Sequence, residues 1–396
     1  MICAVIRVFF IATLLLTLGS AYAQERTPGS VARALSPRNA NYNIDVRLDG
    51  SARSLTGRET IGWKNITNAA TSELRFHLYY NAWRNAQSTY VKERRLARGW
   101  RGDDSIDDED LSAIDITSLT VTPSGSSRTD LTSAMRFISP DDGNADDRTV
   151  VGVTLPSPVP PTGSVSIDIS WTSKIPRDAD RTGAIGNDFF LGQWFPKIGV
   201  LENNGMWNCH QFHAATEFFS DYGVYDVRMT VPRGWPLAAT GEERDRKDNA
   251  DGTTTYRYYQ EDVHDFAWTT SPDFIERHER FDEAGLPPVD MDVTTTSRYY
   301  PSTGSGIELA VSLRIRDPVL QKLTLLKGGE PLPEEVVATE AQLTGSVRYL
   351  FEFVGRMWSR VTAAAACDAR QLPRPCFHTR RASGSSWTMH NYNEGE

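Results

Sequence analysis

The sequence is poor in cysteine, and the few it has cannot close a disulfide framework. Only four of the 396 residues are cysteine, and Cys3 lies in the apolar N-terminal run. The other three are Cys209, Cys367 and Cys376, and an odd number excludes a fully paired set. A local pair of Cys367 with Cys376 remains open, but the fold is not expected to depend on it.

An excess of positive charge is also missing. Acidic residues outnumber basic ones by 51 to 42, which gives a net charge of -9. No stripe of lysine and arginine alternates with aromatic residues, so we expect no nucleic-acid partner. Hydrophobic residues make up 39% of the chain and aromatic residues 10%, enough for a sizeable folded core.

Long apolar runs are absent except at the N-terminus. Residues 8–18 are apolar and follow Arg7, and Ala21-Tyr22-Ala23 has the small residues of a cleavage site. This pattern predicts a signal peptide over residues 1–23 and a secreted or periplasmic protein. No other stretch is apolar enough to cross a bilayer, so we expect no transmembrane segment after signal cleavage.

Strict alternation of apolar and polar residues dominates the middle of the chain. In NYNIDVRLDG, Tyr42, Ile44, Val46 and Leu48 share one face, and VSIDISW and YDVRMTV repeat the pattern. Pro-, Gly- and Asp-rich turns separate these segments. The sequence therefore predicts a mainly β fold, an antiparallel two-sheet sandwich over residues 41–282, after a linker over residues 24–40.

Two regions depart from the alternation. Residues 91–111 are charged and polar and are interpreted as a surface loop, whose acidic residues from Asp103 to Asp110 are more typical of a solvated loop than of a cation site. Residues 283–366 are interpreted as a linker followed by an amphipathic helix over 334–366. Residues 367–396 lack periodicity and are predicted to be a disordered tail.

Histidines raise the question of a metal site. HERFD at His278 falls one residue short of HExxH, the helical zinc motif of peptidases, and no HExxH occurs anywhere in the sequence. It lies in a charged run without a helical apolar face, so an exposed, charged strand end is favoured over a metal site. CHQFHAATEFF places His210, His213 and Glu217 so that a helix would gather them around zinc. Turn-like residues flank this stretch, so structural roles are favoured, and a zinc site of these three residues is the alternative.

Several stretches resemble one known family when they are taken together. GQWFPKIGV, EFFSDYGVYDVRMTVP and VHDFAWTTSPDF occur in this order, and YNIDVRLDG opens the same region. Residues 41–293 resemble the N-terminal β domain of the membrane alanyl aminopeptidase (aminopeptidase N) family of zinc peptidases. In that family this saddle-like β domain packs over a helical catalytic domain, which brings HExxH and a GxMEN strand.

The resemblance implies zinc-dependent peptide hydrolysis for the family, but it does not imply this reaction for the present chain. Relatives use zinc to hydrolyse peptide substrates, whereas this sequence has neither motif, so we expect no catalytic residue and no zinc cofactor here. The helix over 334–366 would begin a missing catalytic domain, and the chain would be a truncated, non-catalytic form. Whether it is an enzyme stays open, and the alternative is a secreted β-sandwich binding module for peptides or a protein partner.

The resemblance also implies one candidate for substrate contact. In relatives the β domain lends a polar side chain to the free amine of the substrate, from the segment that leads to the FPK residues. Gln193 in GQWFPK is the nearest polar residue of this sequence, although its offset from Pro196 does not clearly match the family. An ordinary structural role for Gln193 is the alternative interpretation.

Overall fold

A computed structural model describes most of the predicted β domain. The described residues are 27–31, 33–97, 107–179, 182–215, 218–281 and 289–296. The predicted signal peptide, Glu217, the predicted helix over 334–366 and the predicted tail lie outside them. No helix among the residues described is long and apolar enough to span a membrane.

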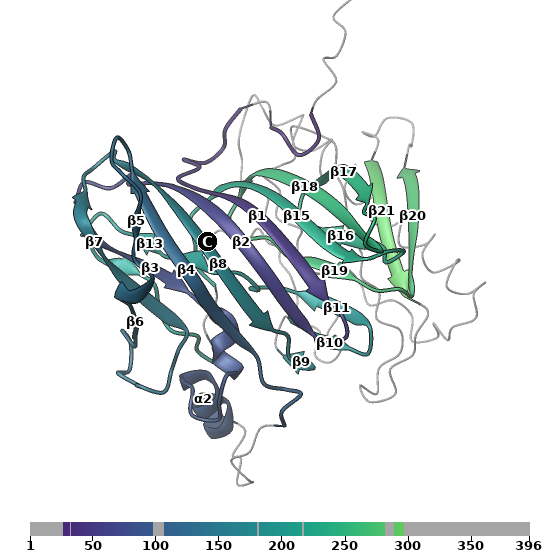
Figure 1. The fold of residues 1–396 in the computed structure, drawn as a ribbon, viewed down its shortest axis with the longest axis horizontal. Helices are drawn as coiled ribbons and strands as arrows, with labels where there is room; N and C mark the ends of the chain where they lie inside the picture. Colours follow the sequence, from purple (N-terminus) through teal and green to yellow (C-terminus); the bar gives the residue numbers. More distant parts are fainter. Residues whose placement is uncertain are drawn as a thin grey trace, which may run out of the picture.

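An eight-stranded sheet forms the face of the molecule that is seen in Figure 1. Its strands follow the order β17-β18-β15-β1-β2-β8-β4-β5, and every pair is antiparallel except β1 with β15. The bounds are β1 Ala40–Asp49, β2 Ser54–Lys64, β4 Ala113–Pro123, β5 Thr129–Asp130, β8 Ser164–Lys174, β15 Gly223–Pro232, β17 Glu242–Asp248 and β18 Thr253–Val263.

Shorter sheets lie behind this one in the view of Figure 1. One has the order β16-β19-β11-β10-β9, with β9 Asp178–Ala179, β10 Thr182–Ile185, β11 Asp188–Leu191, β16 Leu237–Ala239 and β19 Trp268–Thr270. Another has the order β12-β3-β7-β6, with β3 Thr71–His77, β6 Met135–Ile138, β7 Val150–Val159 and β12 Lys197–Ile198. Strands β13 Val200–Leu201 and β14 Trp207–Asn208 form a pair.

The remaining elements are one hairpin and three short helices. Strands β20 Phe274–Phe281 and β21 Val289–Thr296 pair with each other, and the sequence analysis does not anticipate β21. Residues 278–281 of the HERFD stretch therefore lie on β20, in agreement with the predicted strand end. The helices are η1 Tyr79–Trp83, α2 Thr89–Ala97 and η2 Thr132–Ala134. Helix α2 lies where the sequence analysis expects a loop, so that expectation is wrong for residues 91–97.

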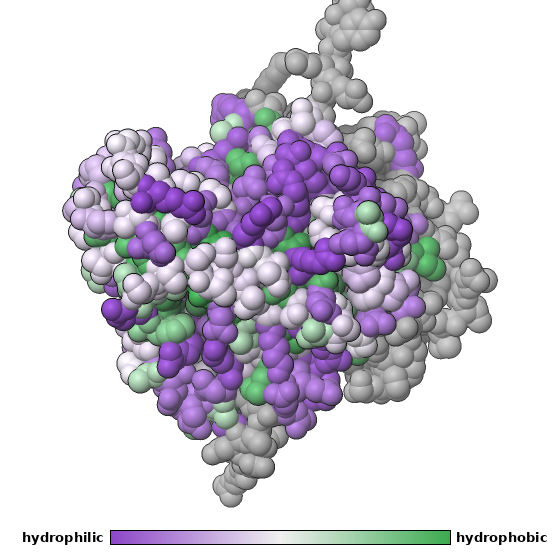
Figure 2. Space-filling model, viewed as in Figure 1, coloured by the Kyte–Doolittle hydropathy of each residue, from purple (hydrophilic) through white to green (hydrophobic). Residues whose placement is uncertain are grey.

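Alternation along the strands builds the core between the layers. In β1 the side chains of Tyr42, Ile44, Val46 and Leu48 are all buried, while the intervening residues face outward. The outward face of the large sheet is mostly hydrophilic or near neutral, as Figure 2 shows. One continuous cluster of buried side chains joins the large sheet to the shorter ones. The predicted mainly β, two-sheet sandwich is thus confirmed.

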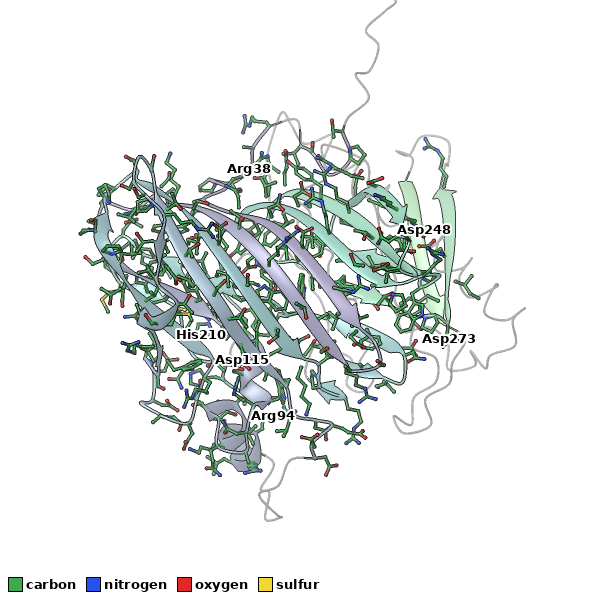
Figure 3. The ribbon with its side chains drawn as sticks, in the orientation of Figure 1. Arg38, Arg94, Asp115, His210, Asp248 and Asp273 are labelled. Carbon is green, nitrogen blue, oxygen red and sulfur yellow. The ribbon has the colours of Figure 1, made fainter. Side chains whose placement is uncertain are left out.

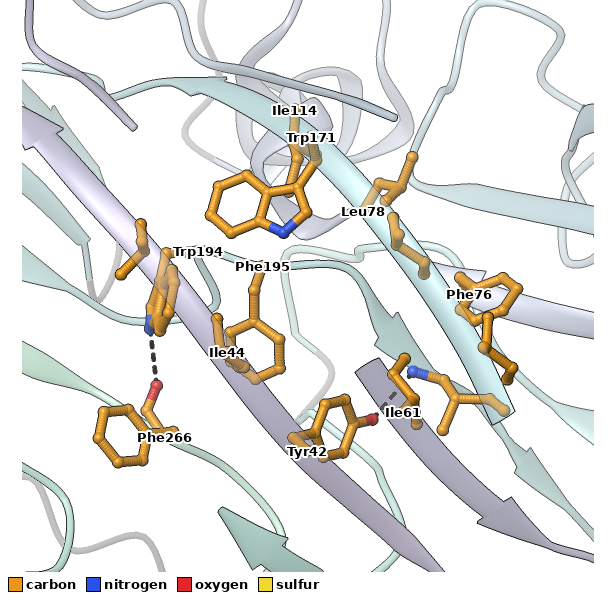
Figure 4. Close-up of a cluster of buried hydrophobic side chains, with 14 of the residues drawn as sticks. Tyr42, Ile44, Ile61, Phe76, Leu78, Ile114, Trp171, Trp194, Phe195 and Phe266 are labelled. Carbon is orange, nitrogen blue, oxygen red and sulfur yellow. Dashed lines mark hydrogen bonds between the residues drawn. The ribbon is translucent and has the colours of Figure 1, made fainter. Parts of the chain in front are cut away.

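Aromatic residues fill the centre of this core. Trp194 and Trp171 are fully buried, with ring centroids 5.7 Å apart (Figure 4). The Trp194 indole Nε1 donates a hydrogen bond of 2.8 Å to the Phe266 carbonyl oxygen, and the Ile198 backbone N–H donates one of 3.1 Å to the Tyr42 hydroxyl. Buried Tyr and Trp side chains commonly find such partners.

Candidate functional site

A buried polar cluster connects two of the stretches that carry the family resemblance. Lys197 Nζ lies 2.6 Å from Asp265 Oδ1 and donates a hydrogen bond of 3.1 Å to Gln193 Oε1. Gln193 Nε2 donates to Asp265 Oδ2. All three residues are at most 3% exposed. We call Gln193, Lys197 and Asp265 the polar centre.

Local structure positions each member of the polar centre. The backbone at Gln193 has a φ of 56°, in the left-handed region. The side chains of Gln193 and of the next residue, Trp194, are both buried. Lys197 lies in β12, opposite His77 of β3. Asp265 precedes Phe266, whose backbone N–H donates 2.7 Å to Asp265 Oδ1. The cluster therefore depends on strand pairing and on the Trp194–Phe266 contact.

The charges of the polar centre compensate each other inside the protein. Burial lowers the pKa of Lys197, and the nearby carboxylate of Asp265 opposes that effect. The Lys197 ammonium also lies 5.4 Å from the Phe195 ring centroid, within the range of a cation–π contact. A buried pair of this kind costs desolvation free energy, so the polar centre fixes a geometry more than it adds stability.

A histidine beside the polar centre is kept neutral. Burial, and then the neighbouring Lys197, lower the pKa of His264. Its Nε2 atom is buried and has no hydrogen-bond partner within the described ranges. The backbone carbonyl of His264 accepts hydrogen bonds from Ser220 Oγ at 2.5 Å and from the Tyr225 hydroxyl at 3.3 Å. Ser220 and Tyr225 belong to EFFSDYGVYDVRMTVP, so a third stretch that carries the resemblance contacts the residue next to Asp265.

The structure places the predicted substrate anchor inside this cluster. Both ends of the Gln193 amide are in use, since Oε1 accepts from Lys197 and Nε2 donates to Asp265. Its role as an anchor stays a prediction. The sequence did not predict a role for Lys197 or Asp265, although both lie in stretches that carry the family resemblance. Lys197 in WFPKIGV and Asp265 in HDFAW are charged residues among apolar neighbours. This local pattern could have indicated that both are buried and functional or paired.

The histidines of CHQFHAATEFF have separate partners. His210 Nδ1 lies 2.7 Å from the Gln211 carbonyl oxygen, and its ring meets the His77 ring edge-on at 5.6 Å. His213 Nδ1 lies 2.8 Å from Glu93 Oε1, and its Nε2 lies 3.0 Å from Asp141 Oδ2. Residues 209–215 form no helix. Within the described ranges no three His, Cys, Asp or Glu side chains gather as metal ligands.

The described part of the acidic loop is paired with basic residues. Arg177 forms ion pairs with Asp107, Glu109 and Asp110, the last at 2.8 Å, and Lys174 pairs with Asp108 at 3.2 Å. These contacts occupy the carboxylates that a cation would use. Cys209 is buried, and burial raises the pKa of its thiol, so it is not a reactive nucleophile.

A hollow of about 460 Å³ lies at the end of β2 and the start of β8. Its lining includes two basic side chains and several hydroxyls: Arg38, Lys64, Thr122, Ser124, Ser164 and Ser166. Figure 3 shows Arg38 and Arg94 of α2 at opposite ends of the ribbon. The Arg38 guanidinium is already paired with Glu261 and Asp262 at 3.0 and 2.8 Å. None of the predicted site residues lines this hollow.

Glu59 is a buried acid without a hydrogen-bond partner among the described residues. It lies on the core face of β2, 3% exposed, and neither of its carboxyl oxygens is hydrogen-bonded within that part of the chain. Burial raises its pKa well above the ordinary value. The folded protein therefore holds Glu59 more readily as the neutral acid than the unfolded chain does.

Replacing Glu59 by Met is expected to stabilise the fold at pH 8 by about 1–3 kcal/mol, because an unsatisfied buried polar group is removed. A raised folded pKa means that wild-type stability falls as pH rises above the unfolded pKa of about 4.3. The gain should therefore be small at pH 4 and larger at pH 8. Urea unfolding at both pH values measures it.

The control for Glu59 is Glu73→Met, which alters an exposed acid on β3 that pairs with Arg75 at 2.7 Å. Surface pairs of this kind contribute about 0–1 kcal/mol. Equal gains from both variants, or a Glu59→Met gain that does not change with pH, would show that Glu59 is not the buried neutral acid described above.

Comparisons with known proteins give distant structural matches. No protein-family model and no curated protein matches the sequence. An M1 zinc metallopeptidase from Deinococcus radiodurans is 15% identical and matches 69% of this chain and 51% of its own, with a TM-score of 0.40. A mutant M1 zinc metallopeptidase from the same organism, bound to a Tyr-Ser-Ala substrate, is 13% identical over 68% and 51%, with a TM-score of 0.39. This chain spans about half the length of those two solved structures.

Proposed function

We propose that residues 41–282 form the substrate-covering β domain of an aminopeptidase N-like zinc peptidase, and that this chain alone hydrolyses no peptide. One observation supports the proposal most. The stretches that resemble the family lie far apart in sequence but meet around the polar centre. Lys197 of WFPK lies 2.6 Å from Asp265 of HDFAW, and Ser220 of EFFSDYGVYDV donates to the His264 carbonyl.

Convergence of this kind is expected of residues that serve one structural unit. Gln193 and Asp265, 72 positions apart, contact each other directly, so the motifs act together in the fold. The interpretation of Gln193 as a contact for the substrate amine belongs to this proposal. In it, Lys197 and Asp265 act as positioning residues, because they fix both ends of the Gln193 amide.

The described residues do not fit a zinc ion. Both ring nitrogens of His213 face carboxylates of Glu93 and Asp141, and the ring of His210 packs edge-on against His77. A zinc site needs three or four ligands that converge on one point. The proposal therefore assigns no step of peptide hydrolysis to these residues, and the chemistry of the relatives would need ligands from elsewhere.

The purified chain is expected to contain no stoichiometric zinc and to release no chromophore from an alanyl p-nitroanilide substrate. The physical reason is that no described group of ligands can lower the pKa of a bound water. Metal analysis and the hydrolysis assay, each repeated after incubation with added zinc, measure this. A true zinc peptidase assayed in parallel is the control.

Two results would contradict the proposal. Turnover that requires zinc would show that the chain is catalytic by itself. Stoichiometric zinc that is lost on His213→Ala, without turnover, would favour the alternative zinc site of His210, His213 and Glu217. The second interpretation of the chain, a secreted binding module, stays a prediction. An exposed apolar face on the predicted helix over 334–366 would favour a missing catalytic domain, and a buried one would favour the module, but this helix lies outside the described residues. Export of the chain rests on the apolar pattern of residues 8–18.

A further inference from the structure

The His213 ring lies between two carboxylates from separate parts of the chain. Its Nδ1 is 2.8 Å from Glu93 Oε1 on α2, and its Nε2 is 3.0 Å from Asp141 Oδ2 in the loop that precedes β7. A neutral imidazole carries one N–H and can donate to only one of them. Only the doubly protonated ring donates to both, so this geometry belongs to the imidazolium form.

The same two carboxylates hold the backbone around His213. Glu93 Oε2 accepts a hydrogen bond of 2.8 Å from the Ala214 N–H, and Asp141 Oδ2 accepts one of 2.6 Å from the Gln211 N–H. Each carboxylate thus binds the ring and one neighbouring amide. Loss of the ring contact on either side removes one of the donors that orient that carboxylate.

Residues 210–215 cover part of the core, and aromatic packing holds them there. Phe212 is 7% exposed, and its ring lies 5.0 Å from both the Trp83 and the Tyr90 rings and 5.7 Å from the Tyr79 ring. Tyr79 in turn lies beside the polar centre, 6.0 Å from Lys197 Nζ. Residues 210–215 contain no helix or strand, so side-chain contacts such as these hold them in place.

We propose that His213 is a proton-dependent clasp that fastens residues 210–215 to α2 and to the loop of Asp141. When the ring is doubly protonated, both carboxylates are engaged and the segment is closed over Tyr79. When the ring loses a proton, one of its nitrogens presents a lone pair to a carboxylate. That hydrogen bond is lost, and the segment opens more often. This inference rests on the geometry of the clasp and is independent of the proposed function.

The direction of the pH dependence follows from the groups that face His213. Burial lowers its pKa, but hydrogen bonds and charge from Glu93 and Asp141 outweigh that effect and raise it above the ordinary 6.5. Asp142, in the same loop as Asp141, adds a further negative charge, and its own pKa is lowered. A raised folded pKa means that the clasp is fully formed below about pH 6.5 and is lost as pH rises through the higher folded value.

Amide hydrogen exchange of the purified chain tests the clasp, because Gln211 and Ala214 are themselves the donors to the two carboxylates. After correction for intrinsic exchange rates, protection of a peptide over residues 209–215 should fall about tenfold between pH 6 and pH 9. In His213→Gln, protection should already be low at pH 6 and should not change with pH. In the control His210→Gln, the wild-type pH dependence should persist.

Further variants keep the test decisive if His213→Gln does not fold. Glu93→Gln removes one charge of the clasp and should shift the loss of protection to lower pH. Protection that does not change with pH in the wild type overturns the proposal, as does pH dependence that persists in a folded His213→Gln. A pH dependence of the same size in peptides far from α2 also overturns it, because that result would indicate global loosening.

Discussion

Replacing Lys197 by Met is expected to lower the free energy of unfolding by about 3–5 kcal/mol, because it leaves a buried carboxylate without its partner. Lys197 and Asp265 side chains are 1% and 2% exposed, and water cannot replace the lost ammonium. Gln193 still donates to Asp265 Oδ2, but one amide donor does not balance a buried charge. Equilibrium unfolding in urea, monitored by circular dichroism, measures the loss.

Two further variants test whether the loss of stability comes from the burial of this ion pair or from the removal of any charged residue. The double variant Lys197→Met, Asp265→Leu should recover part of the lost stability, since no unpaired charge remains in the core. Arg58→Met breaks an exposed pair with Asp45, 3.4 Å apart, and should change stability by about 1 kcal/mol or less. A Lys197→Met variant as stable as Arg58→Met would contradict the burial and pairing of the polar centre.

Replacing Trp194 by Ala is the second large expected effect, a loss of about 3–5 kcal/mol from lost burial and the cavity that remains. The ring is fully buried and meets Trp171, Phe195 and Trp268 at centroid distances of 4.9–5.9 Å. Its indole N–H also satisfies the Phe266 carbonyl. Urea unfolding again gives the free energy, compared with the wild type at the same pH.

The matched variant Trp194→Phe keeps most of the ring and loses the hydrogen bond. It should cost about 1–3 kcal/mol, mainly because the buried Phe266 carbonyl is left unsatisfied. Met206→Ala, at a side chain that is 64% exposed, should stay within about 0.5 kcal/mol. If Trp194→Ala is no worse than Met206→Ala, the WFPK stretch does not anchor the core as described.

These two results bear on how the family-like stretches are interpreted. Large losses at both Lys197 and Trp194 would mean that WFPK and HDFAW are needed for the β domain to fold, whatever it binds. A binding role for Gln193 then has to be measured in variants whose stability is known. Gln193→Glu, for example, would place a third charge in a cluster that holds one pair, and its effect would be structural first.

The sequence by itself determined the class of fold and the strands whose residues alternate strictly. Alternation with period two places Tyr42, Ile44, Val46 and Leu48 on one face whatever the partners of β1 are, because strand side chains alternate geometrically. It also determined that HExxH is absent, and that His278 lies in a charged run without a helical apolar face. These properties are local, so they can be seen without any knowledge of distant contacts.

Only the tertiary structure decided which segments meet. The parallel pairing of β1 with β15 joins Tyr42 to Tyr225, and no local pattern encodes that choice. Helix α2 was missed because its segment is highly charged, and the burial of Tyr90 and Val91 comes from the remote Phe212 cluster. The state of His213 likewise depends on Glu93, 120 positions away. Spacing within CHQFHAATEFF would predict ligands only on a helix, and long-range hydrogen bonds hold residues 211–214 in another conformation.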